Sequence, residues 1–260
     1  MKWKPYDKKI IMYGFVSSYS WLNYGVLRLL LESEFQARYN LIVLDYVKNS
    51  IFRLKNIKKL KLKKCYINLT KEFLSDPNFL VLAYLQIKSK SSNLKIFLNK
   101  KMFDDLNIES FINTAKKISD NTYVFKPAKI VETPKSNNND FKSLMTGSPR
   151  DKIIQKAINI LLNQIFEFEE KIFLKVSHGF RLGYSVHTAL KYIKTAWTGL
   201  YWFIESNIKQ VFVKINHNIL LNLLLKKIKD KRLLDLLRKM FNCKILAPIG
   251  FFFKDNMGIP

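Results

Sequence analysis

Apolar residues recur at intervals of three and four along much of the chain, the spacing of helices that bury one face. The clearest stripe follows Asp151, an acidic residue suited to a helix N-terminus. Its members are Ile153, Ile154, Ala157, Ile158, Leu161, Leu162, Ile165 and Phe166. Similar spacing predicts helices through Phe111, Ala115 and Ile118, over Ile219–Lys227 and over Lys231–Phe241. The pair Asp76-Pro77 predicts a break before a further helix.

Two other segments favour strands. The apolar run Ile245–Phe253 predicts paired strands. From Arg53 to Lys64, lysines alternate with Leu and Ile, so a strand would place Leu60 and Leu62 on one face and lysines on the other. Such a segment is either a solvated edge strand, blunted by its lysines, or a ribbon laid along a phosphate backbone.

The charge of the chain limits the classes of molecule that it is expected to bind. Its 45 Lys and Arg residues outnumber 20 Asp and Glu residues, which gives a formal net charge of +25. Such an excess implies a polyanionic partner, either nucleic acid or an anionic membrane surface. Residues 10–27 are uncharged and just reach the length of a membrane span, but they include several Ser, Asn and Gly residues. We therefore expect no membrane span there.

Composition also limits the chemistry and the compartment. A hydrophobic content of 48% excludes a wholly disordered chain, and 260 residues allow one large core or two modest ones. Two cysteines are too few for a disulfide framework or a zinc site, and the three histidines share no metal-ligand spacing. We expect neither a metal nor a cofactor. The abundance of Lys, Asn, Ile, Phe, Leu and Tyr matches AT-rich codons and indicates an organellar genome, most simply a mitochondrial one.

The densest cluster of motifs lies between residues 177 and 218. The segment Gly179-Phe-Arg-Leu-Gly-Tyr-Ser185 is followed by His187-Thr-Ala-Leu190 and then by Glu205-Ser-Asn-Ile-Lys209, which the resemblance below assigns to a loop, the start of a helix and the end of a strand. This order resembles the fingers-to-palm junction of group II intron reverse transcriptases, the intron-encoded maturases of bacteria and organelles. Three more segments are similar to that family: Leu82–Ser89, Phe125–Lys135, and Arg150 with Asp151.

The resemblance covers roughly residues 79–260 and implies an α+β fold with reverse-transcriptase fingers and an incomplete palm. We expect residues 1–75 to be a basic, unassigned N-terminal extension. Residues 76–176 would be the fingers-like region. Residues 177–260 would hold the fingers-to-palm junction and a partial palm that stops before the Tyr-x-Asp-Asp hairpin.

The resemblance also indicates lost catalysis. Asn207 stands where the family has its first metal-binding aspartate, and Val213 and Asn216 replace two further acids. Polymerases hold two divalent ions, and Mg²⁺ needs anionic carboxylates that asparagine does not supply. We expect a catalytically inactive protein that is not an enzyme.

The sequence therefore predicts an RNA-binding protein. We expect structured RNA to contact cationic residues at these positions: Lys58, Lys59, Lys61, Lys63, Lys64, Lys129, Lys135, Lys142, Arg150 and Arg181. The favoured function is a structural subunit of an organellar ribonucleoprotein, most simply the mitochondrial ribosome. The alternative is a group II intron splicing maturase, either whole or as one piece of a split maturase. In either case we expect neighbouring proteins or a second chain to complete the palm near residues 245–260.

Overall fold

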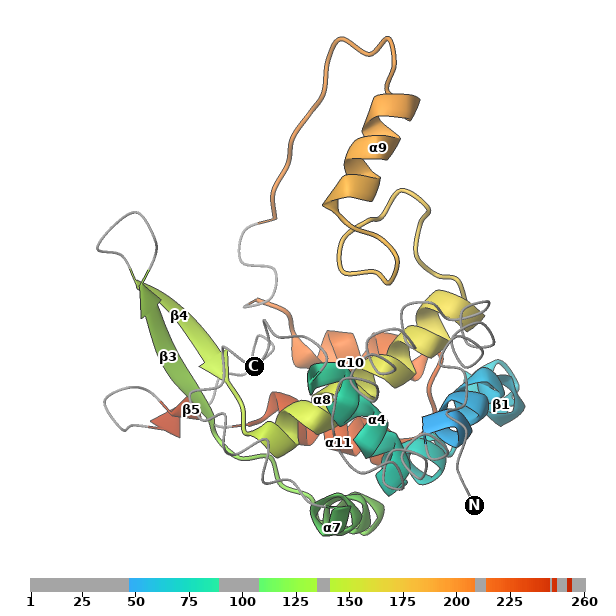
Figure 1. Cartoon of the computed structure of the whole chain (residues 1–260), viewed down its shortest axis with the longest axis vertical. Helices are drawn as coiled ribbons and strands as arrows, with labels where there is room; N and C mark the ends of the chain where they lie inside the picture. Colours follow the sequence, from blue (N-terminus) through green and yellow to red (C-terminus); the bar gives the residue numbers. More distant parts are fainter. Residues whose placement is uncertain are drawn as a thin grey trace, which may run out of the picture.

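The fold is α+β, with a helical body from which two parts project (Figure 1). The computed structural model describes residues 47–88, 108–134, 141–208, 214–243, 245–246 and 252–253; side-chain surroundings are described for 47–87, 108–128, 147–208 and 214–243. One projection is a β-hairpin. The other, which we call the arm, comprises residues 171–208 and carries helix α9.

The body is built mainly of helices. Besides a helical segment at residues 47–55, the helices and helical turns are η1 (Ile57–Leu60), η2 (Thr70–Leu74), α4 (Pro77–Lys88), α7 (Ile108–Ser119), α8 (Pro149–Asn163), η3 (Gln164–Glu169), α9 (Val186–Ala196), α10 (His217–Leu225) and α11 (Lys231–Phe241). The helices predicted after Asp76, through Phe111 and Ile118, and over the α8, α10 and α11 regions are confirmed.

Helix α8 and the π-helical turn η3 form one continuous rod through the body, because η3 begins at the residue after α8 ends. Ser148 caps the N-terminus and Pro149 follows at the first helical position, where proline loses no hydrogen bond. The predicted apolar stripe lies in the core: Ile154, Leu161 and Ile165 are fully buried. The rod packs against α4 and η2, and α4 packs against α7.

A single hydrophobic core joins these elements. It reaches back to Val47 and Ile51 in the helical segment 47–55 and forward to Leu237 and Phe241 in α11. Residues before position 76 therefore contribute to the same core as α4 and α8.

Two small sheets flank the body. In the first, β1 (Lys61–Leu62) pairs antiparallel with β2 (Cys65–Tyr66). The second has the strand order β4-β3-β5-β6, with β3 (Ala128–Pro134), β4 (Phe141–Thr146), β5 (Ile245–Leu246) and β6 (Phe252–Phe253). β3 is antiparallel to β4 and parallel to β5, and β5 is antiparallel to β6. The prediction of paired strands within Ile245–Phe253 is thus confirmed.

The predicted strand over Arg53–Lys64 is wrong. The segment ends a helix at residue 55, makes the 3-10 turn η1 and enters β1 only at Lys61. Lys63 and Lys64 have φ angles of 46° and 71°, as a two-residue hairpin turn requires. Ile57, which is fully buried, anchors the helical turn in the core, so the apolar residues do not line one face of a strand.

The strand expected to end at Glu205–Lys209 is also not formed in its described part. Residues 201–208 have no regular structure, and their side chains are exposed. This segment lies in the arm, away from the four-stranded sheet (Figure 1), and a strand needs a neighbour to satisfy its backbone groups.

The buried carboxylate of Asp151 fixes the first projection to the rod. The side chain is 2% exposed, and it accepts hydrogen bonds from Tyr123 Oη at 2.7 Å, Ser148 Oγ at 2.6 Å and the Lys126 amide at 3.2 Å. Burial, followed by the hydrogen bond and charge of Asp151, raises the pKa of Tyr123 above its usual value. These bonds join the end of α7, the entry to β3 and the exit from β4 at one point.

Replacing Asp151 with Ala leaves the Tyr123 hydroxyl, the Ser148 hydroxyl and the Lys126 amide without their acceptor. We expect the free energy of unfolding to fall by about 3 kcal/mol, since each buried unpaired group costs about 1–3 kcal/mol. Urea denaturation measures it, with Asp120→Ala, at an exposed position after α7, as the control. Equal midpoints for the two variants would contradict this role for Asp151.

Candidate nucleic-acid interface

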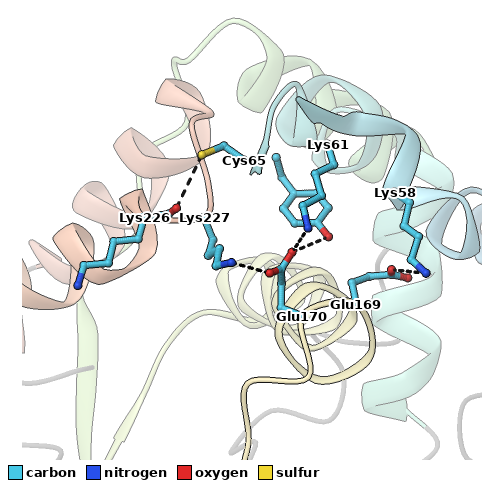
Figure 2. Close-up of polar contacts among 8 residues, drawn as sticks. Lys58, Lys61, Cys65, Glu169, Glu170, Lys226 and Lys227 are labelled. Atoms are coloured by element: carbon cyan, nitrogen blue, oxygen red, sulfur yellow. Dashed lines mark hydrogen bonds and ion pairs between the residues drawn. The ribbon is translucent and has the colours of Figure 1, made fainter. Parts of the chain in front are cut away.

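At the C-terminal end of the rod, Glu169 and Glu170 bind lysines from distant parts of the chain (Figure 2), and nearby Glu167 binds Arg181. Glu170 accepts hydrogen bonds from Lys61 Nζ at 2.5 Å and Lys227 Nζ at 2.6 Å, and the Tyr66 hydroxyl lies 3.3 Å away. Lys58 Nζ approaches Glu169 Oε2 at 3.2 Å without hydrogen-bond geometry. We call this group the acid cluster: Glu167, Glu169 and Glu170.

The acid cluster is held by its cations. A helix C-terminus repels negative charge, so acids there need compensation. Hydrogen bonds from Lys227 and Lys61 lower the pKa of Glu170 from its ordinary value to about 2. Burial, with the charges of Glu170 and Glu169, raises the pKa of Tyr66 to about 12. The β1–β2 hairpin and the link before α11 are thereby fastened to the same end of the rod.

Backbone hydrogen bonds reinforce this junction. The Tyr66 amide donates to Lys227 O at 2.7 Å, and the Lys229 amide donates to Tyr66 O at 2.8 Å. The Cys65 thiol lies 3.7 Å from Lys226 O (Figure 2). The hairpin is therefore an internal brace between two distant segments.

This geometry divides the lysines that the sequence assigned to one RNA-binding ribbon. Lys58 and Lys61 form ion pairs with the acid cluster, so their charges are largely used within the protein. Lys59, Lys63 and Lys64 are exposed and have no ion-pair partner among the described residues. The single ribbon is therefore wrong, and the last three lysines remain candidates for contact with a polyanion.

Arg181, another predicted RNA contact, is built into the base of the arm. Its side chain is only 9% exposed and forms a two-pronged hydrogen-bonded pair with Glu167, at 2.6–3.2 Å. It also donates to Leu174 O at 2.6 Å and Ser177 O at 2.8 Å, and its guanidinium lies 4.2 Å from the Tyr184 ring centre. With its donors engaged in this way, Arg181 organises the loop before α9.

Beyond that base, the arm exposes many large apolar side chains. Every side chain of α9 is exposed or half-buried, although Ser185 and Thr188 form a complete capping box at its start. The extended segment after it includes Trp202, which is 91% exposed, and further exposed residues: Trp197, Leu200, Tyr201, Phe203, Ile204 and Ile208. Apolar patches of this kind mark surfaces that another molecule or segment covers.

Several known proteins with similar sequences are named as products of introns. The chain is 34% identical to the COX1/OXI3 intron 2 protein of Saccharomyces cerevisiae over 73% of its own length. It is 34% identical to the group II intron-encoded protein LtrA of Lactococcus lactis over 67% of its length. The chain belongs to the family of group II intron-encoded reverse transcriptases and maturases. It spans 22% and 28% of those two relatives, and no family model matches it.

A more distant relative is the mitochondrial nuclear intron maturase 1 of Arabidopsis thaliana. It is 27% identical over 34% of this chain, which corresponds to 12% of its own length.

Asn207 and Asn216, which the sequence resemblance places at positions of family acids, have different settings. Asn207 is exposed in the arm, two positions after Glu205. Asn216 caps α10, and its side-chain oxygen accepts from the amides of Asn218 at 2.9 Å and Ile219 at 3.2 Å. Asparagine caps helices as well as aspartate does, so this position keeps a structural role without a carboxylate.

The histidines have ordinary contacts. His217 is buried and stacks on Phe241, His178 lies 2.9 Å from Thr188 Oγ1, and His187 is exposed. Across the described residues, no group of three or more His, Cys, Asp or Glu side chains is arranged to hold a metal ion.

Three of the other predicted RNA contacts lie on or near the first projection. Arg150 is exposed at the start of α8. Lys129 and Lys142 belong to β3 and β4, but their side chains lie outside the described residues, as does Lys135 entirely. The apolar segment 10–27 is also outside them. In the part that is described, no helix has the length and hydropathy needed to cross a membrane.

Sequence reasoning missed the residues that form the brace. Glu170, Lys227 and Asp230 are separated from their partners by more than 50 positions, and no local pattern marks them. The one available signal was the clustering of acids, which are scarce in this chain. Three of the 20 lie within four positions at the end of a long apolar stripe.

Glu170 gives the chain a pH-dependent stability. The pKa of Glu170 in the folded chain is about 2, below its ordinary value of 4.5. Its contribution to the free energy of unfolding is therefore complete above about pH 4.5 and is lost as the pH falls toward 2. We expect Glu170→Gln to cost about 1–2 kcal/mol at pH 7, after allowing for solvent screening, and much less near pH 3. Urea denaturation at both pH values measures this, with the exposed Glu109→Gln as control. A cost that does not change with pH would refute the assignment.

Arg181→Lys keeps the charge but loses the planar fork that binds Glu167 and two carbonyls. We expect amide hydrogen exchange to accelerate over residues 177–188 while exchange in α8 stays unchanged, because the loop loses its anchor and the core does not. Lys175→Gln, an exposed change in the same arm, is the matched control. Unchanged exchange over 177–188 would show that Arg181 does not organise the loop.

Proposed function

We propose that this protein is a group II intron maturase that binds intron RNA in mitochondria and has no polymerase activity. The observation that carries the proposal is the 34% identity to the intron 2 protein over 73% of the chain. Other relatives have names that specify a group II intron-encoded protein and a mitochondrial intron maturase. The sequence alone favoured a structural subunit of the mitochondrial ribosome. These relatives favour a maturase instead.

Within this function, the chain is divided as the sequence resemblance indicates. Residues 76–176 correspond to reverse-transcriptase fingers, and residues 177–260 correspond to the fingers-to-palm junction and part of a palm. Residues 1–75 precede them as an extension. These are regions of correspondence and not separate folding units, because one core spans residues 47–241.

RNA binding follows from the surplus of positive charge. The acid cluster neutralises Lys58, Lys61, Lys227 and Arg181 internally, yet the chain keeps a net charge of +25. Most cations are therefore left for an external polyanion. Among the described residues, Lys59, Lys63, Lys64 and Arg150 are exposed and suited to phosphate contact.

Loss of polymerase chemistry follows from Asn207. An asparagine carbonyl has the shape of a carboxylate arm but no charge, and Mg²⁺ at a polymerase site is held through anionic carboxylates. Stabilising a folded intron requires positioning and charge neutralisation, and neither depends on that carboxylate. The proposed maturase function is thus compatible with Asn207.

A further polypeptide covers the apolar surface of the arm in this proposal. Burying one large apolar side chain is worth about 1.5–3 kcal/mol, so the exposed aromatic residues from Trp197 to Phe203 favour association. The partner lies close to the junction between fingers and palm, where the rest of a palm would pack.

We expect no template-dependent primer extension by the purified chain with Mg²⁺ or Mn²⁺. Asn207→Asp is also expected to be inactive, because Val213 and Asn216 still lack the other two acids. The measurement is extension of a labelled primer on an RNA template, with an active reverse transcriptase as the positive control. Incorporation by the wild-type chain would overturn the proposed loss of chemistry.

The maturase proposal also predicts which lysines contribute to RNA binding. For a group II intron transcript, we expect Lys59, Lys63 and Lys64 changed together to Gln to flatten the slope of log K against log salt by about 2 units, at roughly 0.7–0.9 per phosphate contact. The matched variant changes Lys58 and Lys61, which are paired internally; it is expected to lower Tm with little change in slope. A larger slope change in the second variant would contradict the division of these lysines.

A further inference from the structure

A pocket of about 450 Å³ lies where the segment after β2 meets the link before α11. The two sides are more than 150 positions apart in the sequence and are held together by buried Asp230. This carboxylate accepts from the Thr70 amide at 2.7 Å and from the Leu233 amide at 3.1 Å. The pocket is lined by Ile67, Asn68, Thr70, Lys71, Lys229, Asp230, Lys231 and Arg232.

The lining is strongly cationic. Lys71, Lys229, Lys231 and Arg232 are all exposed around the pocket, against the single carboxylate of Asp230. Both oxygens of that carboxylate already accept backbone amides, so it is committed to the fold. None of the three lysines has an ion-pair partner among the described residues, whereas the lysines of the acid cluster do. Among the described residues, Arg232 donates one hydrogen bond, to Ser119 O at 3.2 Å.

A second observation points to a ligand at the same place. Thr70 is 1% exposed and lines the pocket, and its hydroxyl has no hydrogen-bond partner among the described residues. A buried polar atom left unpaired destabilises the fold, so a partner is expected to satisfy it. The N-terminus of α11, an 11-residue helix, also opens at this pocket and adds the positive end of its dipole.

We infer that this pocket binds phosphate groups of an RNA backbone. The volume exceeds one phosphate, and four cations surround it. The lining has one apolar residue, Ile67, and no aromatic side chain. Sites for small ligands such as free nucleotides are predominantly apolar or aromatic, so this lining fits a charged backbone better than a base. The inference rests on the proposed RNA-binding function and assigns it a place outside the lysines of residues 58–64.

The first test changes Lys71, Lys229 and Lys231 together to Gln and measures binding of the full chain to a group II intron transcript over a salt series. We expect the slope of log K against log salt to flatten by about 2 units, at roughly 0.7–0.9 per phosphate contact. The matched triple variant, Lys116, Lys117 and Lys126 to Gln, removes the same charge from other exposed positions and is expected to leave the slope nearly unchanged. Equal slopes for the two variants would overturn the inference.

Thr70→Val tests the pocket independently of surface charge. It removes the unpaired hydroxyl at nearly constant shape, so we expect the Tm of the free chain to rise and the affinity for RNA to fall by a few-fold. A rise in Tm with unchanged RNA affinity would show that the Thr70 hydroxyl does not contact RNA, and would contradict the inference.

Pyrophosphate is the probe that separates RNA from a free phosphate compound. If it raises the Tm of the wild-type chain but the lysine variant keeps the wild-type salt slope with RNA, the pocket binds free phosphate and the RNA assignment is wrong. If the wild-type chain binds the intron transcript, and the lysine variant changes neither the salt slope with RNA nor the Tm shift with pyrophosphate, the inference fails while the proposed function stands. If the wild-type chain does not bind the transcript, both fail.

Discussion

The structure depends on one continuous helical rod, Pro149–Glu169, with acids at both ends. The middle of the rod carries the apolar stripe that packs in the core, and the fold requires this packing whichever molecule the protein binds. At the N-terminal end, Asp151 gathers the groups that lead into and out of the β-hairpin. At the C-terminal end, Glu167 holds the arm, and Glu170 holds both the β1–β2 hairpin and the link before α11. Each projecting part is thus attached by a carboxylate of the rod or next to it.

This arrangement resolves a conflict in the composition. A chain with a net charge of +25 repels itself, and compact packing brings its cations closer together. Placing scarce acids at the junctions neutralises the cations that must be close and leaves the others on the surface. The same division separates structural from binding lysines: Lys61 and Lys227 meet at one carboxylate, whereas Lys229 and Lys231, only a few positions further on, open onto a pocket.

The helices were predictable because their signals are local. The apolar spacing, Asp151 near one helix start and the break at Asp76-Pro77 placed α8, α4, α7, α10 and α11 correctly. The paired strands β5 and β6 followed from an apolar run. Lysine alternation before Lys64 was misleading, because backbone turns at Lys63 and Lys64 and the burial of Ile57 decide that region.

The roles of Arg181 and Lys61 depended on partners 14 and 109 positions away, which periodicity does not reveal. The strand expected before Lys209 depended on a neighbouring strand that the described arm does not contact. The family relation, in contrast, was carried by short motifs in a fixed order, and the intron proteins confirm it.

The exposed cations of this protein are proposed to bind intron RNA. The most direct measurement is to crosslink the chain to RNA in living cells, purify it under denaturing conditions and sequence the attached RNA. We expect reads concentrated within a group II intron, above the level obtained with an unrelated basic protein of similar charge. Reads concentrated in ribosomal RNA, without intron enrichment over that control, would contradict it.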